Sequence, residues 1–259
     1  MSRLRTLALM YGRNLRQFPR LPTVLVFGIA MPVIQLLLFG NVFSAITDLP
    51  GFPYADIPYY AYIAPAIVVL TTFLGMANSS AAFLVDLRTG YFDKLRTTPA
   101  SAPLVIFGRL LAEMTRVAAQ ATMILLLALA LGARIETGIL GGVVMILASV
   151  VFSASVTGLL SMFLAMKTRS DQATQSAFPL FFVFLFLSTA YMPKSQLPGW
   201  LATVVGYNPM DYLIRGVRNL MLESWAEAAG PLLVAFACSI AIASLLSFVN
   251  MRVYRTIVE

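Results

Sequence analysis

Long runs of apolar residues recur along the whole chain, and they constrain its fold more than any other feature. Several of them reach the roughly 18–20 residues that a helix needs to cross a bilayer. Hydrophobic residues make up 59% of the 259 residues and charged residues only 11%, whereas a soluble domain carries about 25% charged residues. A soluble fold could not hide so much apolar surface. The sequence therefore predicts an all-α membrane protein.

We expect six transmembrane helices in a single transmembrane domain, residues 1–259. They cover Leu21 to Phe43, Tyr60 to Leu84, Leu110 to Leu131, Ile139 to Met166, Ala173 to Met192 and Pro231 to Val249. The first run follows several arginines, as in a signal peptide, but its apolar stretch is too long for one, so we expect a retained helix. Cys238 lies inside an apolar run and indicates packing rather than a disulfide.

The basic residues are unevenly divided between the two ends of these spans. If the N-terminus is cytoplasmic, 14 Lys and Arg lie inside, and only Arg134, Lys194, Arg215 and Arg218 lie outside. This bias follows the positive-inside rule and predicts that both termini are cytoplasmic in a multi-pass protein of the cell membrane. The net charge of +7 therefore needs no nucleic-acid partner to explain it.

Two further segments predict helices that do not span. Residues 1–20 place apolar side chains on one helical face and arginines on the other, which is typical of an interfacial helix; a disordered basic leader is the alternative. Residues 193–229 contain two apolar stretches too short to span, on either side of Asn208 and Pro209. We expect short re-entrant helices there, before the last span and tail at 230–259, with an extracellular surface loop as the alternative.

The composition excludes several kinds of catalytic site. Histidine is absent, which removes H-E-x-x-H zinc sites and Ser-His or Cys-His nucleophile pairs. The chain also lacks a G-x-x-x-x-G-K-[ST] phosphate loop, so it cannot hydrolyse ATP by that route. We expect no catalytic residue, no metal and no bound cofactor in this chain.

The segment between the second and third spans, at about 86–100, is the sharpest local feature. Gly90 interrupts the preceding helix, whereas Pro99 and Pro103 end a short amphipathic turn and begin the next helix. Such an element suits docking into a groove on a partner protein; the alternative is a solvated connector whose aromatic residues touch lipid headgroups. The candidate docking residues are Asp86, Gly90, Tyr91, Phe92, Asp93, Leu95, Arg96 and Pro99.

Charged and polar residues inside the spans need partners. Arg109, Glu113 and Arg116 follow the spacing i, i+4, i+7 and share a helix face. We favour a structural ion-pair strip over a proton or substrate site, because two arginines keep Glu113 ionised. Small residues every four positions in the fourth span predict close helix packing (Ser149, Ser153, Thr157 and Ser161). Candidates for a substrate path or a dimer seam are Gln35, Asn78, Phe178 and Phe182.

Taken in order, these features match a known pattern. Its parts are the N-terminal helix, Asp86-x-x-x-Gly90-x-x-Asp93-x-Leu95-x-x-x-Pro99, Gly108-Arg109-Leu110, Leu197-Pro198-x-Trp200, Asn208-Pro209-Met210 and Arg215. Over nearly its full length the chain resembles the membrane permease subunit of type-two ATP-binding-cassette (ABC) exporters, which include daunorubicin-resistance-type permeases and polysaccharide exporters. In that family a glutamate often occupies the positions of Asp86 and Asp93.

The resemblance implies that the segment at about 86–100 is a coupling helix, which docks on a separately encoded ABC ATPase that binds ATP and Mg. It implies two ATPases and two permeases, the second permease being a copy of this chain or a homologue, among membrane lipids. It also identifies the helices after Met192 as an outer gate, with Pro198, Trp200, Asn208, Pro209 and Arg215 as its residues.

We therefore expect the pore-forming subunit of an ATP-driven exporter that moves a hydrophobic or amphipathic molecule, a drug or lipid, out of the cytoplasm or inner leaflet. Export of a lipid-linked polysaccharide or glycan is the alternative within the family. An ion-coupled secondary transporter needs titratable groups near the midplane, and Glu113 is the only acid in any predicted span. A lipid-modifying enzyme would need a cluster of acids or a metal site.

Overall fold

The computed structural model describes residues 3–16, 22–48, 50, 52–54, 57–80, 84–85, 102–170, 172 and 178–258. Within these ranges every regular element is a helix, which confirms the predicted all-α class. The α-helices are α1 (Arg3–Leu15), α2 (Pro22–Val42), α3 (Tyr59–Ala77), α6 (Ala102–Ala130), α7 (Gly138–Ser153), α8 (Leu159–Thr168), α10 (Phe178–Phe186), α11 (Gly199–Val205), α12 (Pro209–Leu222) and α13 (Trp225–Val258). Short 3-10 turns form η2 (Ser44–Asp48) and η4 (Lys194–Gln196), and the π-helical segment η3 (Ala154–Gly158) joins α7 to α8.

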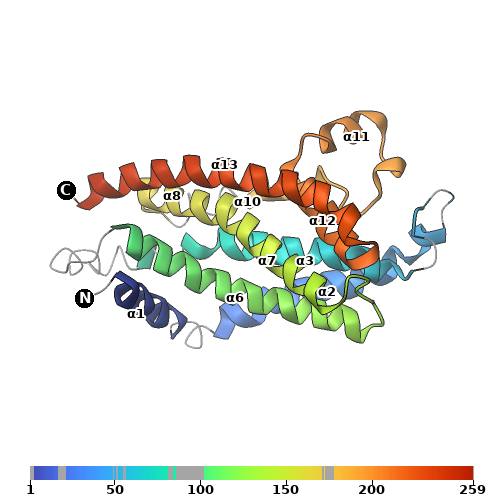
Figure 1. Cartoon of the computed structure of the whole chain (residues 1–259), viewed down its shortest axis with the longest axis horizontal. Coiled ribbons are helices and arrows are strands. Elements are labelled where there is room, and N and C mark those ends of the chain that lie inside the picture. The colour runs from blue at the N-terminus through green and yellow to red at the C-terminus, as the bar shows by residue number, and fades with distance from the viewer. Residues whose placement is uncertain are drawn as a thin grey trace.

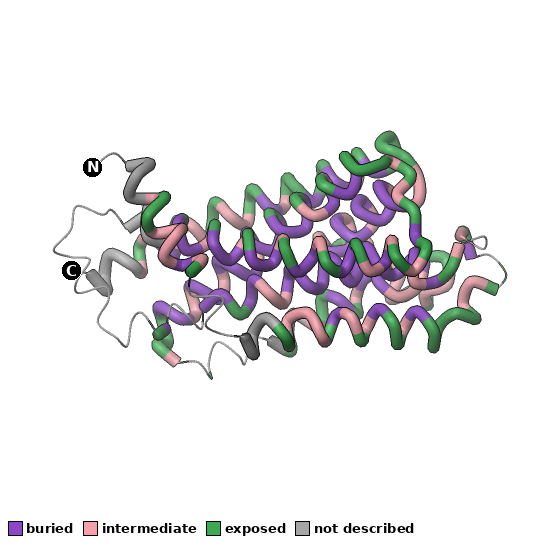
Figure 2. The backbone as a smooth tube through the Cα atoms, turned by 90° about the horizontal axis from the view of Figure 1, so that it is seen from below, coloured by how far each residue is buried: buried purple, intermediate pink, exposed green. Residues whose placement is uncertain are grey.

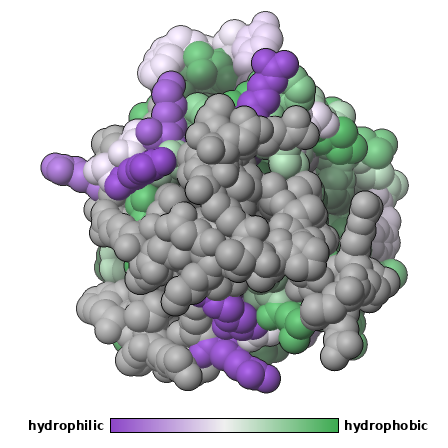
Figure 3. Space-filling view, turned by 90° about the vertical axis from the view of Figure 1, so that its left-hand side faces the viewer, coloured by the Kyte–Doolittle hydropathy of each residue, from purple (hydrophilic) through white to green (hydrophobic). Residues whose placement is uncertain are grey.

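The helices form an elongated bundle with two distinct ends. α1 and the C-terminal end of α13 lie at one end, called here the terminal end, and η2 and α11 lie at the opposite end, called here the loop end (Figure 1). Exposed basic side chains at the terminal end include Lys167, Arg169 and Arg252. Figure 3 looks onto this end and shows hydrophilic side chains standing beside apolar ones. The charge asymmetry read from the sequence therefore corresponds to a geometric end of the molecule.

α3 forms the centre of the bundle. It contacts α2, α6, α7 and α12, and 83% of the residues in its most apolar stretch are buried, against 17% in α13. Figure 2 shows the same contrast, with buried residues along the central helices and exposed residues along the outer ones. Large apolar side chains on the outer face of α13 remain exposed, among them Leu233, Ile240 and Leu245. That pattern suits a bundle whose surroundings are as apolar as its core.

Within the part of the chain that the structure describes, four helices are long and apolar enough to cross a membrane: Tyr59–Ala77, Phe107–Ala130, Gly138–Thr168 and Trp225–Val253. They coincide with the second, third, fourth and last predicted spans. The described apolar stretch of α2 is shorter, Gly28–Val42, and the described part of the fifth predicted span is the nine-residue α10. The six-span count therefore stays a prediction.

Several boundaries differ from the prediction, and at the start of α13 a polar side chain from another helix accounts for the difference. α13 begins at Trp225 rather than at Pro231. Pro231 has no N–H to offer the carbonyl of Glu227, and the side-chain amide of Asn219 donates to that carbonyl instead, at 3.0 Å. The helix thus continues through a residue that we expected to begin it.

α10 ends earlier than predicted, and the second predicted span is interrupted by a turn at Asn78, after which 79–80 and 84–85 are again helical. α3 ends at Ala77, where Asn78 caps it and its side-chain amide donates to the carbonyl of Leu74 at 3.0 Å. α10 ends at Phe186 and turns follow at 187–189, so the helix does not reach Met192. α6 begins at Ala102, before the predicted Leu110, with Pro103 in its first turn, where proline is well tolerated.

Two predicted packing features are present. The N-terminal helix forms, as α1, and lies against α6: the Cβ of Met10 reaches Gly108, and Tyr11 Oη and Thr115 Oγ1 are 3.0 Å apart. Its interfacial position stays a prediction. The small residues of the fourth span face α3, and Thr157 Oγ1 donates to the carbonyl of Phe73 at 2.9 Å. Ser153 Oγ lies 2.9 Å from Thr72 Oγ1. These hydroxyls bind the backbone and one another at a close helix contact.

Candidate functional site

α12 is a short helix at the loop end that packs against α13, α3 and α7. It begins at Asn208, whose side-chain oxygen accepts the backbone N–H of Met210 at 3.0 Å, with Pro209 at the first helical position. Both residue types favour a helix start. The side-chain amide of Asn208 donates to the carbonyls of Phe184 and Leu187, at 2.7 and 2.6 Å. One side chain therefore begins α12 and satisfies carbonyls at the end of α10.

Asp211 is a fully buried carboxylate on the first turn of α12. One oxygen accepts hydrogen bonds from the backbone N–H and the hydroxyl of Thr189, both at 2.7 Å. The other oxygen forms an ion pair with the Nε of Arg215, also at 2.7 Å. A buried carboxylate is tolerated only when its lone pairs are satisfied in this way. Asp211 thereby fixes the turn at 187–189 against α12.

Arg218 lies two turns further along α12 and is only 3% exposed. Its guanidinium donates to the carbonyls of Tyr62, Thr189 and Ala190, at 3.2, 2.8 and 3.1 Å. The guanidinium carbon also sits 3.9 Å from the ring centroid of Tyr62, a cation–π arrangement. Arg218 thus joins three elements, α12, α3 and the turn after α10.

Thr189 connects these two charged residues. Its hydroxyl donates to Asp211 and accepts from Arg218, at 2.7 and 3.4 Å. We call Tyr62, Thr189, Asp211, Arg215 and Arg218 the α12 clasp, because together they hold this helix in the bundle by charged hydrogen bonds. Such bonds are stronger than neutral ones.

The far end of α12 is anchored separately. The backbone N–H of Glu136 donates to the backbone carbonyl of Met221 at 2.9 Å, and the hydroxyl of Thr137 donates to the backbone carbonyl of Leu220. Helix C-termini leave carbonyls unsatisfied, and the connection between α6 and α7 supplies their donors. Nearby, the hydroxyl of Tyr54 donates to Glu223. Burial, and then this bond, raise the pKa of Tyr54, so the phenol keeps the proton that it donates.

A second charged group lies on α6. Arg116 forms an ion pair with Glu113 at 2.8 Å and also donates to Gln120 Oε1 and to the carbonyl of Gly75, at 3.0 and 2.9 Å. These contacts join α6 to α3. Arg109 is buried on the same helix. The structural role that we expect for Arg109, Glu113 and Arg116 rests on this geometry and stays a prediction.

The other candidate residues lie apart. The predicted docking residues, 86–99, fall outside the described residues, as does the side chain of Phe178. Gln35 is half-buried on α2, and Phe182 is half-buried and stacks on Phe186 at 6.4 Å. Asn78 is exposed and caps α3. Its role in a substrate path or a dimer seam stays a prediction.

The five predicted gate residues divide into two groups. Asn208, Pro209 and Arg215 belong to α12 and its clasp. Pro198 precedes α11, and Trp200, on that helix, is 67% exposed. α11 stands outside the main bundle (Figure 1). The structure therefore does not bring all five together.

Sequence reasoning missed Asp211, Arg218, Thr189 and Tyr62. A signal was nevertheless present: Asp211, Arg215 and Arg218 repeat the i, i+4, i+7 spacing of one acid and two arginines that singled out Glu113. The predicted location hid it, because charges on short helices that dip only partway into the membrane can reach water and then need no partner. Only the fold shows that α12 is buried among spans.

Comparisons with known proteins agree with one another. Residues 5–222 match the family model described as ABC-2 type transporter. The chain is 26% identical over 209 residues to the daunorubicin resistance ABC transporter permease protein DrrB1 of Streptomyces coeruleorubidus, covering 81% of this chain and 72% of that protein. It is 22% identical over 203 residues to a protein of Mycobacterium tuberculosis named probable doxorubicin resistance ABC transporter permease protein DrrC, covering 76% and 68%.

Proposed function

Because this chain belongs to the ABC-2 type transporter family and is a membrane permease subunit of an ABC transporter, we propose that it forms the pore of an ATP-driven exporter. The cargo is a hydrophobic or amphipathic molecule, a drug or a lipid, taken from the cytoplasm or inner leaflet. Two relatives carry names that refer to resistance to daunorubicin and doxorubicin, and the helices that would line a pore are mainly apolar. Both facts support this class of cargo.

The observation that carries the proposal is the α12 clasp. α12 has 14 residues, so it is about 21 Å long and cannot cross the roughly 30 Å hydrocarbon core. A short helix placed among spans and held by buried charges is suited to close one end of a pathway. In the proposed transporter, the clasp keeps the loop end shut, and the loop end faces the outside.

The energy source is the separate ATPase that the family implies. We place its docking surface at the coupling segment, residues 86–99, which joins α3 to α6 in sequence. α3 and α6 are the helices that Arg116 joins, and α3 also carries Tyr62 of the clasp. ATP binding in the partner would therefore reach the loop end through α3. We propose two ATPases and two permeases, with ATP and Mg held by the ATPases.

Co-purification from native membranes tests the proposal. Wild type is expected to bring down an ABC ATPase with measurable ATP hydrolysis, and a Gly90→Pro, Tyr91→Ala, Leu95→Ala variant is expected to lose both. Tyr207→Ala is the matched control, since Tyr207 is an 84% exposed aromatic residue at the loop end, and it should retain the partner. A wild type that purifies without any ATPase would contradict the exporter.

Transport is tested with daunorubicin as the probe. Cells that express the chain with its ATPase should accumulate less daunorubicin than cells with the triple variant, and the difference should vanish when ATP is depleted. Equal accumulation in the two strains, with the ATPase bound and active, would reject this drug class as cargo while leaving the permease assignment intact.

A further inference from the structure

The fourth span is interrupted near its middle by the π-helical segment η3. The backbone N–H of Leu159 donates to the carbonyl of Ala154, five residues back, whereas an α-helical bond reaches four residues back. One turn of η3 therefore holds one residue more than an α-helical turn. Single π turns are rare, they kink helices, and they are frequent at functional sites. The span thus consists of two helices, α7 and α8, joined by an irregular turn.

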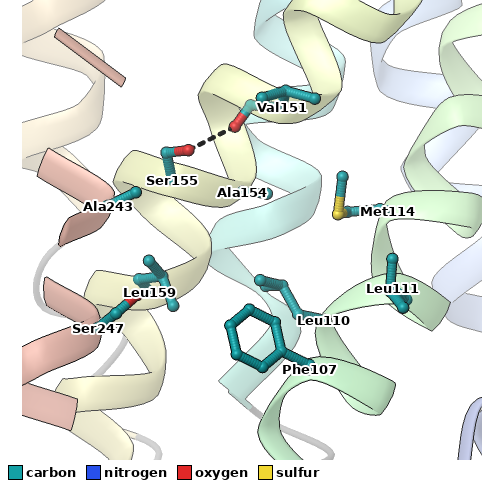
Figure 4. A pocket seen from close by; sticks show the side chains of 10 residues that line it. All are labelled: Phe107, Leu110, Leu111, Met114, Val151, Ala154, Ser155, Leu159, Ala243 and Ser247. Atoms are coloured by element: carbon teal, nitrogen blue, oxygen red, sulfur yellow. Dashed lines mark hydrogen bonds between the residues drawn. The ribbon is translucent and has the colours of Figure 1, made fainter. Parts of the chain in front are cut away.

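Side chains supply hydrogen bonds to the carbonyls around this turn. The hydroxyl of Ser155 donates to the carbonyl of Val151 at 2.8 Å, the dashed bond in Figure 4. On the other side of η3, the side-chain amide of Asn250, a buried residue of α13, donates to the carbonyl of Leu159 at 3.0 Å. Carbonyls before and after the π turn thus have a donor besides the backbone. The turn can therefore change its geometry without leaving these buried carbonyls unpaired.

The contact between α3 and the fourth span offers its hydroxyls alternative acceptors. Thr157 Oγ1, on η3, lies 2.9 Å both from the carbonyl of Ser153 in its own span and from that of Phe73 on α3. Ser161 has the same choice, between a carbonyl of its own span at 3.0 Å and one of α3 at 3.5 Å. A hydroxyl carries one hydrogen, so each bond to α3 can be exchanged for one within the span. Sliding along this contact therefore leaves neither hydroxyl unsatisfied.

The two halves of the span belong to different parts of the bundle. α7 contacts α12, the helix of the clasp, and also α3 and α6, which Arg116 joins to each other. α8 packs chiefly on α13, to whose terminal half Asn250 ties it. η3 therefore lies at the border between a part that carries the clasp and a part made of α8 and the terminal half of α13.

The packing around η3 is uneven. Ala154, Ser155 and Leu159 line one wall of a hollow of about 270 Å³, and the other walls belong to α6 and α13 (Figure 4). Gly158 packs closely by contrast, because a Cβ there would lie 2.8 Å from the Cε of Met76 on α3. η3 is thus held tightly against α3 and loosely on the side of the hollow. α8 can tilt on that side without displacing packed side chains.

We propose that η3 is a hinge at which α8 swings relative to α7 during the transport cycle. The swing moves α8 and the terminal half of α13 away from the part of the bundle that carries the clasp. The terminal end of the molecule can then open while the clasp keeps the loop end shut, as transport in one direction requires. The inference rests on the proposed exporter for the cycle that drives the hinge, whereas the hinge itself rests on the geometry of η3.

Removing one residue tests whether η3 holds an extra one, and this test needs no ATPase. Without Ser155, Val156 becomes the fourth residue after Val151, so its N–H can take over that carbonyl in one continuous α-helix. The midpoint of thermal unfolding in detergent should equal or exceed that of wild type. Removal of Leu147, an exposed residue in the regular part of the span, is the matched control. It turns one half of the span by about 100° and should lower the midpoint by more than about 4 °C. Equal losses for the two deletions would overturn the extra residue.

Spin labels measure the swing in the complex with the ATPase. In a Cys238→Ala background, Ala119→Cys on α6 and Thr168→Cys on α8 form the test pair, and Ala119→Cys with Leu140→Cys on α7 forms the control pair, all at exposed positions. Labelled chain is diluted into unlabelled chain and measured without nucleotide and after trapping with ATP and vanadate. A kink of about 20° over the ten residues of α8 moves its end by about 5 Å. The test pair should shift by that distance and the control pair should not.

The same measurements separate the hinge from the function on which it rests. Removal of Ser155 should abolish the shift and lower daunorubicin efflux about tenfold, while ATP hydrolysis continues. Equal shifts in both pairs would show that the fourth span moves as one body and would overturn the hinge. No shift in either pair, with hydrolysis and efflux intact, would overturn it as well. A shift of the test pair alone without any efflux would support the hinge and count against the proposed cargo.

Discussion

At the scale of single residues, the loop end depends on a threonine. Thr189 gives its hydroxyl to Asp211 and receives a bond from Arg218, and its backbone N–H and carbonyl bind the same two residues. A buried charge that loses a partner costs more than the lost bond is worth. The uncharged Thr189 therefore stabilises two of the three charged residues of the clasp, Asp211 and Arg218.

Thr189→Val keeps the shape of the side chain and removes its hydroxyl. We expect a loss of about 1–3 kcal/mol in unfolding free energy, measured as a lower midpoint of thermal unfolding in detergent. Thr203→Val is the control, since Thr203 is exposed on α11 and its hydroxyl donates to a carbonyl of its own helix at 3.0 Å. Equal midpoints of unfolding for the two variants would show that the Thr189 hydroxyl contributes nothing to stability.

Tyr54 offers a test by pH. Its pKa in the folded protein is raised by burial and by Glu223, whereas an unfolded tyrosine has a pKa of about 10. The group therefore stabilises the fold fully below about pH 10, and the contribution is lost as pH rises through the folded pKa. Between about pH 9 and 12, wild type should lose stability more steeply than Tyr54→Phe. Parallel curves of stability against pH for the two proteins would contradict the burial of this phenol.

At the scale of elements, α12 and α13 meet at a glycine. A Cβ on Gly216 would lie 2.7 Å from the Cγ of Leu232 and 3.2 Å from its backbone nitrogen. The two helices approach closely because no side chain stands between them. This contact determines how α12 rests on the longest helix of the bundle.

Gly216→Ala should therefore destabilise the fold by about 1–3 kcal/mol, the usual cost of overpacking. Gly230→Ala is the matched control: Gly230 lies on α13, and a Cβ there meets nothing within 4 Å. In that helix alanine should be neutral or stabilising, by up to about 1 kcal/mol. Chemical denaturation of both variants checks the difference, and a stable Gly216→Ala would contradict the close approach.

The elements themselves were more predictable than their ends. Apolar length alone located α3, α6, α7–α8 and α13, since the bilayer fixes how long a span must be. Apolar length could not place the start of α13. Pro231 leaves the carbonyl of Glu227 without a helical N–H donor, and Asn219 of another helix supplies the hydrogen bond instead. The end of α10 likewise depends on Asn208. Such caps are tertiary contacts, and a single sequence does not show which helices are neighbours.

At the scale of the whole molecule, the charge bias predicts which end faces the cytoplasm. In a Cys238→Ala background, Tyr207→Cys places a thiol at the loop end and Thr168→Cys places one at the terminal end, at positions that are exposed. A membrane-impermeant maleimide should label Tyr207→Cys in intact cells, and Thr168→Cys only after permeabilisation. The reverse pattern would invert the topology and turn the clasp toward the cytoplasm.

The candidate site, like the fold, could be predicted from the sequence only in part. The predicted gate residues on α12, Asn208 and Arg215, could be named from the sequence because they belong to the motifs that carry the family resemblance. Asp211 and Arg218 could not be assigned a role, since their importance comes from burial, and burial of a 14-residue helix follows from packing against α3, α7 and α13.

α13 also has a consequence for the membrane around the protein. The candidate span Trp225–Val253 has 29 residues, which is about 43 Å of helix against a hydrocarbon core of roughly 30 Å. Its two ends, which carry Glu227 and Arg252, extend past the hydrocarbon, and the length that stays inside depends on how far the helix tilts. Since α12 rests on its first turns, bilayer thickness bears directly on the geometry of the clasp.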